Sequence, residues 1–521
     1  MFLIIGSLVL AAASAVAAGE QPAEVFEGTA VHTAQNPVDE VVFARLKELN
    51  IQPAKVCSDA VFVRRVYLDV IGTLPKGYET EQFILSGTPN KRKLLIDRLL
   101  ERDEFADYWA MKWSDLLRVK AEFPINLWPN AAQTYHHWIR TCIQDNMPYD
   151  QFVRELLTSS GSNFRVPPVN FYRAIQSKEP QAIAKTVALN FMGMRAEKWP
   201  SNKLAGMSAF FSEIGYKPTS EWKEEIVLFD MGKFTNDLVK SATFPDGTRV
   251  RLSPDRDPRE VFARWLIDPK NPWFTQNIAN RAWSWLLGRG IVQEPDDIRA
   301  DNPPSDPKLL ALLEKNLIAS HYDIKQLFRL ILNSKTYQLS ALPATDNPEG
   351  PAHFAFYPLR RLEAEVLVDA LDQITGATEN YSSAIPEPYT FIPGDVRSIA
   401  LPDGSITSSF LEMFGRPPRD TGLESERNNR TAADQRLHLL NSSHVLVKLE
   451  QSALVPKVLQ SKKSPRDIAM GLYLEILSRM PTPGEVKIVE NYYQTSKLDK
   501  SRATVDLAWA LINSKEFLYR H

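Results

Sequence analysis

The sequence contains few of the residues that build metal and redox centres. Its 521 residues include two cysteines, Cys57 and Cys142, and eight histidines. Two thiols exclude a four-cysteine zinc site and an iron–sulfur cluster bound by four cysteines. HExxH, C-x-x-C-H, a Walker-type glycine loop and G-x-S-x-G are also missing. We therefore expect no cofactor and no bound metal.

An excess of one charge is missing as well. Lys and Arg number 61 against 63 Asp and Glu, which gives a net charge of -2. Nucleic acids and anionic membranes need a basic face on their partner, so the composition argues against both. The hydrophobic fraction of 44% is typical of a soluble globular protein that needs no disulfide or metal. Whether Cys57 and Cys142 form a disulfide is left open.

Long apolar runs are confined to the N-terminus. Residues 1–18, MFLIIGSLVLAAASAVAA, form an apolar run that ends in the small-residue cleavage motif Ala15-Val16-Ala17. The run is short for a membrane span. We therefore predict a signal peptide at 1–18 and a periplasmic or secreted protein without a membrane span, with a buried N-terminal helix as the alternative.

Apolar spacing predicts a mainly α-helical array. Residues 19–55 are polar and weakly periodic, which indicates an N-terminal arm. Val63, Val66, Tyr67 and Val70 then recur at helical spacing, and similar patterns predict one helical domain at 56–200 and a second at 259–521. The 36 prolines predict short, interrupted helices.

The segment 201–258 has a different pattern. Ile226–Phe229 and Thr248–Leu252 resemble short strands, and the turn signal Pro245-Asp246-Gly247 precedes the second. We therefore predict a linker with short β-strands, a small β insertion between the two helical domains.

An internal repeat connects the two helical domains. Tyr67-Leu68-Asp69 is followed by Leu74-Pro75 and Glu79, and Tyr473-Leu474-Glu475 is followed at identical spacings by Met480-Pro481 and Glu485. Asp103-Glu104-Phe105 and Lys515-Glu516-Phe517 form a second related pair. A proline that ends one helix and a glutamate that supports the next helix start are scaffold features. The pattern therefore predicts duplicated helix–turn–helix units.

The densest group of charges lies at Phe414–Arg430, FGRPPRDTGLESERNNR. Such a loop is a solvated turn, an internal ion-pair network or a ligand site, and we favour the last two. Arginine forks suit carboxylate, phosphate and sulfate groups, but they suit the loop's own carboxylates equally well. The candidate binding residues are Arg416, Arg419, Asp420, Glu424, Glu426 and Arg427, with Arg360, Arg361 and Asn441 expected nearby.

Two further site hypotheses involve carboxylates. Glu424 and Glu426 would face the same side of an extended loop, and paired carboxylates perform acid–base chemistry on glycosides, here together with Asp420. A second polar cluster, Asp296–Asn302, could bind a hard cation. It also suits a turn that leads to a helix N-cap at Ser305 or Asp306, which is the interpretation we favour.

Several blocks of this sequence resemble known domains. FVRRVYLDVIGTLP at Phe62–Pro75 and the block at Lys91–Arg118 resemble the domain of unknown function numbered 1549, of the planctomycete cytochrome-linked type. The block at Asn271–Val292 and FGRPPRDTGLESER at Phe414–Arg427 resemble its usual companion, numbered 1553. The resemblance covers roughly 40–200 and 255–521. It implies an exported protein of planctomycetes or related bacteria, in a family whose biochemical role is not established.

The sequence departs from the family pattern at two places. Relatives often carry C-x-x-C-H in the first domain, but the matching stretch here, Phe191–Phe211, contains neither cysteine nor histidine. Covalent haem attachment needs those thiols, so electron transfer is disfavoured. Relatives also tend to have cysteine in the charged loop where Ser425 stands, which limits the chemistry to charge and hydrogen bonding.

These observations favour a non-catalytic binding or assembly protein. Its polar site would take an acidic ligand, such as an acidic or sulfated glycan, or an exported protein partner. A hydrolase acting on polysaccharide is the alternative, and an electron-transfer component is the second alternative.

Overall fold

The computed structural model describes residues 23–28, 33–34, 36–234, 240–392, 394–461 and 464–521. The predicted signal peptide at 1–18 lies outside these residues. Within them, every helix is too short or too polar to cross a membrane.

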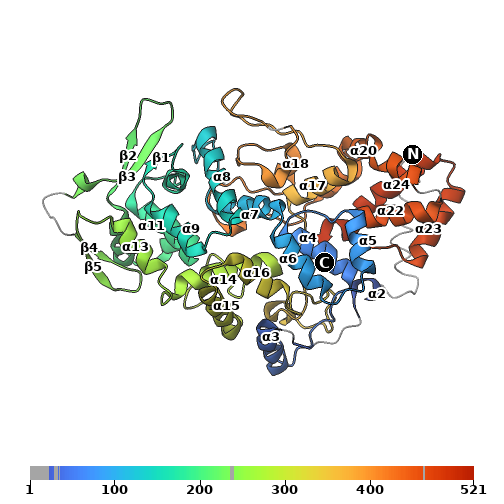
Figure 1. The fold of residues 1–521 in the computed structure, drawn as a ribbon, viewed down its shortest axis with the longest axis horizontal. Helices are drawn as coiled ribbons and strands as arrows, with labels where there is room; N and C mark the ends of the chain where they lie inside the picture. The colour runs from blue at the N-terminus through green and yellow to red at the C-terminus, as the bar shows by residue number, and fades with distance from the viewer. Residues whose placement is uncertain (1–22, 29–32, 35, 235–239, 393, 462–463) are drawn as a thin grey trace.

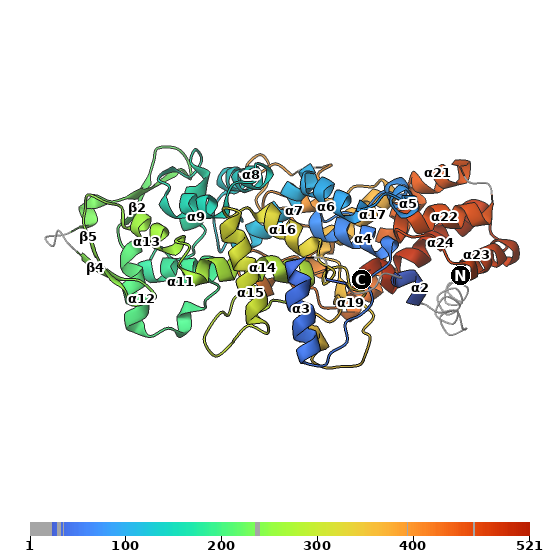
Figure 2. The ribbon, with the colours of Figure 1, turned by 60° about the horizontal axis from the view of Figure 1, so that its bottom comes forward.

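The fold is mainly α-helical, as predicted, and elongated (Figures 1 and 2), with β4 and β5 near one end and α23 near the other. The helices before residue 210 are α2 (Ala23–Phe26), α3 (Pro37–Glu48), α4 (Asp59–Val70), α5 (Gly77–Leu85), α6 (Lys91–Leu100), α7 (Asp103–Leu116), α8 (Pro129–Gln144), α9 (Tyr149–Thr158), α10 (Asn170–Arg173), α11 (Pro180–Met192) and α12 (Ser201–Ser208).

The later helices are α13 (Pro258–Leu266), α14 (Pro272–Leu287), α15 (Pro307–Ala319), α16 (Ile324–Leu332), α17 (Ala364–Thr375), α18 (Ser409–Met413), α19 (Ala433–Asn441), α20 (Ser443–Glu450), α21 (Leu454–Ser461), α22 (Pro465–Ile476), α23 (Pro483–Thr495), α24 (Lys500–Ile512) and α25 (Lys515–Leu518). Many helices begin at a proline, because the first helical position needs no N–H donor and the ring presets the helical φ angle.

The predicted β insertion is present as two small antiparallel sheets. β2 (Ile214–Pro218) and β1 (Gly161–Ser162) both pair with β3 (Glu225–Phe229), and β4 (Lys240–Thr243) pairs with β5 (Arg249–Leu252). The strands expected at 226–229 and 248–252 correspond to β3 and β5. The sequence pattern did not indicate a further pair, β6 (Arg360–Arg361) with β7 (Tyr519–Arg520).

The second half of the expected arm, 19–55, is a packed helix. In α3, Val38, Val42 and Leu46 are buried at i, i+4 and i+8 spacing, and Asn36 caps the helix through Val38 N. Three apolar positions within one short helix are a weaker signal than the longer patterns downstream, so the sequence did not indicate this helix.

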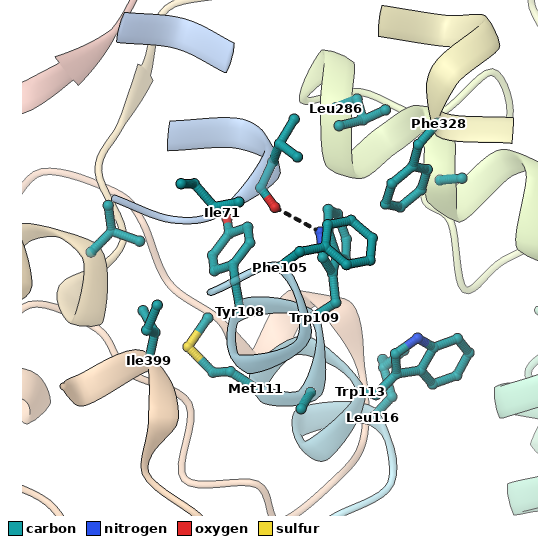
Figure 3. Close-up of a cluster of buried hydrophobic side chains, with 14 of the residues drawn as sticks. Ile71, Phe105, Tyr108, Trp109, Met111, Trp113, Leu116, Leu286, Phe328 and Ile399 are labelled. Atoms are coloured by element: carbon teal, nitrogen blue, oxygen red, sulfur yellow. Dashed lines mark hydrogen bonds between the residues drawn. The ribbon is translucent and has the colours of Figure 1, made fainter. Parts of the chain in front are cut away.

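One continuous hydrophobic core contains residues from both helical regions (Figure 3). The indole of Trp109 on α7 donates a hydrogen bond to the carbonyl of Val70 at 3.0 Å, and its ring lies 4.5 Å from that of Phe328 on α16. Trp113 and Phe105, also on α7, are buried in the same cluster. α7 therefore joins the first helical region to α14 and α16.

The two helix–turn–helix units, α4–α5 and α22–α23, each contain the same kinds of internal contact. Glu79 accepts a hydrogen bond from Lys76 N at the start of α5, and Glu485 accepts one from Thr482 N at the start of α23. One arginine then pairs with each glutamate: Arg102 bonds Glu79 at 3.3 Å and Arg479 bonds Glu485 at 2.7 Å.

The second repeated pair completes these contacts. Arg102 also bonds Glu104 at 2.5 Å, and Arg479 bonds Glu516 at 2.6 Å. Glu104 and Glu516 are the residues that the sequence repeat matched. The two arginines, however, stand at unmatched positions, one before α7 and one in the turn after α22.

Candidate functional site

The charged loop at 414–430 lies against the last turn of α7. Arg419 Nε is 2.9 Å from one oxygen of Asp115, and Arg427 Nη2 is 2.6 Å from the other. The Arg419 side chain is fully buried and that of Arg427 is 8% exposed. Two loop arginines thus share a single carboxylate from α7.

A second carboxylate completes this arrangement. Arg427 Nη1 is 2.7 Å from Glu365 in the first turn of α17, and Arg416 Nε lies 3.6 Å from the same carboxylate. The Glu365 side chain is fully buried. An acidic residue in the first helical turn is favoured by the helix dipole. Arg427 therefore bridges α7 and α17, and we call Arg416, Arg419, Arg427, Asp115 and Glu365 the clamp.

Burial and neighbouring charges shift the pKa values of three groups in the clamp. Burial opposes ionisation of Asp115, but Arg427 and Arg419 hold the pKa of its carboxyl below its usual range. Burial likewise disfavours the charge on Arg427, but Asp115 and Glu365 keep its pKa well above the ordinary value. Burial and then neighbouring Arg419 lower the pKa of Arg416 to about 10, which leaves it protonated.

The loop carboxylates each have a different partner. Asp420 is 2.7 Å from Lys120 Nζ, Glu426 accepts from the backbone N–H of Asp420 at 2.9 Å, and Glu424 accepts from the indole N–H of Trp285 at 2.5 Å. Burial raises the pKa of Glu424. The segment Glu424–Glu426 is a short 3-10 turn and not an extended strand, so its two glutamates do not share one face.

The three expected neighbours of the loop lie at different places. Arg361 Nη2 donates to the carbonyl of Phe414 and so contacts the loop. Arg360 instead bonds Asp69 of α4 at 3.1 Å. Asn441 is exposed at the end of α19, and within the part of the chain that the structure describes no hydrogen bond joins it to the loop arginines. The structure therefore brings Arg361 to the loop, but not Arg360 or Asn441.

Two open cavities formed by described residues lie away from the clamp. A polar cleft of about 330 Å³ is lined by Glu79, Arg102, Asp369 and Arg397, among others. An apolar groove of about 530 Å³ is lined by Phe26, Leu342, Leu359 and Tyr519, among others. Neither wall contains a residue of 414–430, so neither cavity opens onto the clamp.

Each of the two helical regions matches a protein-family model. A model described as "Protein of unknown function (DUF1549)", PSCyt2, matches residues 37–204, and one described as "Protein of unknown function (DUF1553)", PSD1, matches residues 258–493. The chain pairs a DUF1549 domain with a DUF1553 domain. No curated protein and no solved structure matches it. The β2–β5 strands of this DUF1549–DUF1553 protein lie between the two matched regions.

These boundaries place the clamp between the two domains. Asp115 belongs to the DUF1549 region, whereas Arg416, Arg419, Arg427 and Glu365 belong to the DUF1553 region. The arginines of one domain thus neutralise a carboxylate of the other.

A second buried network also links the domains. Fully buried Asp69, from the DUF1549 region, is 3.1 Å from both Arg360 and Arg520, and it accepts hydrogen bonds from the hydroxyls of Tyr337 at 2.9 Å and Tyr357 at 2.7 Å. We call these five residues the Asp69 hub. The repeat contained Asp69, and Arg360 was a candidate neighbour of the charged loop, but no sequence signal indicated that Arg360 and the other three residues pair with Asp69.

Glu363 connects the hub to α7. It pairs with Arg520 at 3.2 Å, accepts from Tyr108 at 2.8 Å and pairs with Lys112. Burial opposes its charge, but Lys112 and Arg520 hold its pKa well below the usual range.

The other sequence candidates are accounted for within the fold. Asp296 pairs with Arg281 at 2.6 Å, and Asp306 caps α15 by accepting from Lys308 N, which agrees with the capping interpretation. Cys57 and Cys142 are both buried and free, so no disulfide joins them. Among the described residues no group of three or more His, Cys, Asp or Glu side chains is arranged to hold a metal ion.

The clamp has a testable dependence on pH. The pKa of Asp115 is lower in the folded protein than in the unfolded chain, so its pairing stabilises the fold above about pH 4 and is lost as the pH falls through the folded-state pKa. Asp115→Asn should therefore be less stable than wild type at pH 7, and the difference should shrink towards pH 3. Urea midpoints at both pH values measure it, and an unchanged difference would contradict the ionised state of Asp115.

Proposed function

We propose that this DUF1549–DUF1553 protein is a non-catalytic binding protein for an acidic glycan, and that its charged loop is an internal clamp and not the ligand site. The observation that carries the proposal is the position of Arg427. Its side chain bridges Asp115 of one domain and Glu365 of the other while remaining 8% exposed. A ligand could reach this guanidinium only by separating the two domains.

The buried charges of the clamp and the Asp69 hub support a role in fixing the two domains relative to each other. Desolvation cancels much of the attraction in a buried ion pair, but loss of one partner leaves an uncompensated charge and is costly. The clamp and the Asp69 hub therefore penalise any arrangement of the domains that separates their charges. A fixed arrangement suits a protein that presents a preformed surface to its partner.

The contacts of the loop carboxylates do not favour a hydrolase. Glycosidases place two carboxyl groups about 5–10 Å apart on either side of an accessible bond. Asp420, Glu424 and Glu426 instead bond Lys120, Trp285 and the loop backbone. An electron-transfer role is also not favoured, because Phe191–Phe211 supplies neither thiol nor imidazole for haem.

The proposal includes export of the protein from the cytoplasm. The apolar run at 1–18 and its small-residue motif support a periplasmic or secreted protein. An acidic extracellular glycan would then be accessible to it. An exported protein partner is the alternative in the same compartment.

The function is tested with a panel of neutral and acidic polysaccharides. Affinity electrophoresis should show retardation by at least one acidic polysaccharide, and a reducing-end assay should show no release of sugar. The variants are Glu424→Gln and, as a matched control, Glu412→Gln, an exposed glutamate just before the loop. Turnover that disappears in Glu424→Gln alone would overturn the proposal, as would the absence of any retardation.

A further inference from the structure

Three aromatic side chains from distant segments meet on one surface of the molecule. The Trp128 ring lies 6.4 Å from that of Trp222 and 5.9 Å from that of Tyr389, and both contacts are edge-on. Trp222 is 71% exposed and Tyr389 58%. Trp128 precedes α8, Trp222 lies in the turn between β2 and β3, and Tyr389 lies between α17 and α18. Together with Lys223, we call these three residues the aromatic patch.

The patch lies on an accessible face. Figures 1 and 2 both show α8 and the β2–β3 hairpin on the same upper side of the molecule. Single exposed rings are common on soluble proteins, but contiguous exposed apolar groups mark binding surfaces, and here two exposed rings flank a half-buried third.

The backbone at Trp128 adds a second observation. Its φ angle is +73°, in the region that favours glycine, and a bulky residue there is strained. The chain thus carries an indole at a position where glycine would fit without strain. Strain of this kind is concentrated at functional sites.

One unpaired cation belongs to the patch. Lys223 Nζ lies 5.5 Å from the centre of the Trp128 ring and 5.2 Å from that of Trp222. Among the described residues no carboxylate pairs with Lys223, whereas the adjacent carboxylates are engaged. Glu221 is 3.8 Å from Arg165, and Glu224 accepts from the Ser162 and Thr219 hydroxyls. Glu221 and Glu224 both lie within 4 Å of Arg165, so Lys223 is the cation left for an anionic group of a ligand.

We propose that the aromatic patch binds the pyranose rings of an acidic polysaccharide. The C–H face of a sugar ring packs on an aromatic face, and the exposure of Trp222 and Tyr389 leaves ring surface for such a contact. Lys223 supplies a charged donor for a carboxylate or sulfate on the sugar. This inference rests on the proposed function, because it names the surface and the ligand class of that binding activity.

The test uses polygalacturonate as the acidic probe and dextran as the neutral one. In affinity electrophoresis, Trp222→Ala should weaken binding of polygalacturonate by at least about fivefold, since exposed ring stacking is lost. Lys223→Gln should remove the preference for polygalacturonate over dextran. The matched control is Met231→Ala, because Met231 is 62% exposed beyond the opposite end of β3. Urea midpoints confirm that each variant is folded.

The outcomes separate the two proposals. If wild type binds polygalacturonate and Trp222→Ala binds it equally well, the patch is overturned but the binding function is retained. If wild type binds no acidic polysaccharide in the panel, both are overturned. If the patch variants instead lose only an exported protein partner, the glycan assignment is overturned.

Discussion

Arg427→Met is expected to lower the free energy of unfolding by about 3–5 kcal/mol. The substitution keeps an unbranched apolar side chain but removes the guanidinium that bridges Asp115 and Glu365. Arg419 still faces Asp115, and Arg416 lies 3.6 Å from Glu365, so the loss should fall near the lower value. Urea unfolding at neutral pH measures it.

The matched control for this variant lies three residues further on. Arg430 is in the same loop but exposed, and its side chain makes no hydrogen bond or ion pair within the described chain. Arg430→Met should therefore change the stability by less than about 0.5 kcal/mol. Equal effects of the two substitutions would show that Arg427 does not hold the domains together.

Asp69→Asn is expected to destabilise the protein by a similar amount, about 3–5 kcal/mol. The carboxylate is fully buried and faces two guanidinium groups, those of Arg360 and Arg520. An amide can still accept hydrogen bonds from Tyr337 and Tyr357, but it cannot neutralise the two arginines. The urea midpoint again supplies the measurement.

A surface carboxylate serves as the control for the hub. Glu450 pairs with Arg502 at 2.9 Å, and both side chains are 39% exposed. Glu450→Gln should cost less than about 1 kcal/mol, because exposed ion pairs contribute little. If Asp69→Asn costs no more than Glu450→Gln, the hub is not required for the fold.

Local patterns predicted the helical frame well. The repeat around Tyr67 and Tyr473 corresponds to two real helix–turn–helix units, because the proline and glutamate positions govern helix ends through contacts a few residues apart. Strands β3 and β5 were also predicted, because a run of strand-forming residues and a turn signal beside it are local in the sequence. β6 and β7 were missed because each is two residues long and its partner lies far away in the chain.

The pairing partners of the charged loop could not be predicted from the sequence. Its composition left two interpretations, a ligand site and an internal network, and only burial distinguishes them. Arg419 is paired with Asp115, 304 positions earlier, and no local signal reveals such a pairing. Near balance between arginines and carboxylates in one loop is a hint of internal pairing. Glu424 and Glu426 would face the same side only if this segment were extended, and the segment is instead a 3-10 turn.

The Asp69 hub also constrains how this protein folds. Asp69 lies 291 positions before Arg360 and 451 before Arg520, so the pairing of this buried carboxylate is incomplete until the chain around residue 520 has been synthesised. Contacts of such long range slow folding and prolong the lifetime of partly folded states. We therefore expect the two domains to acquire stability together rather than one after the other, although the DUF1549 region is made first.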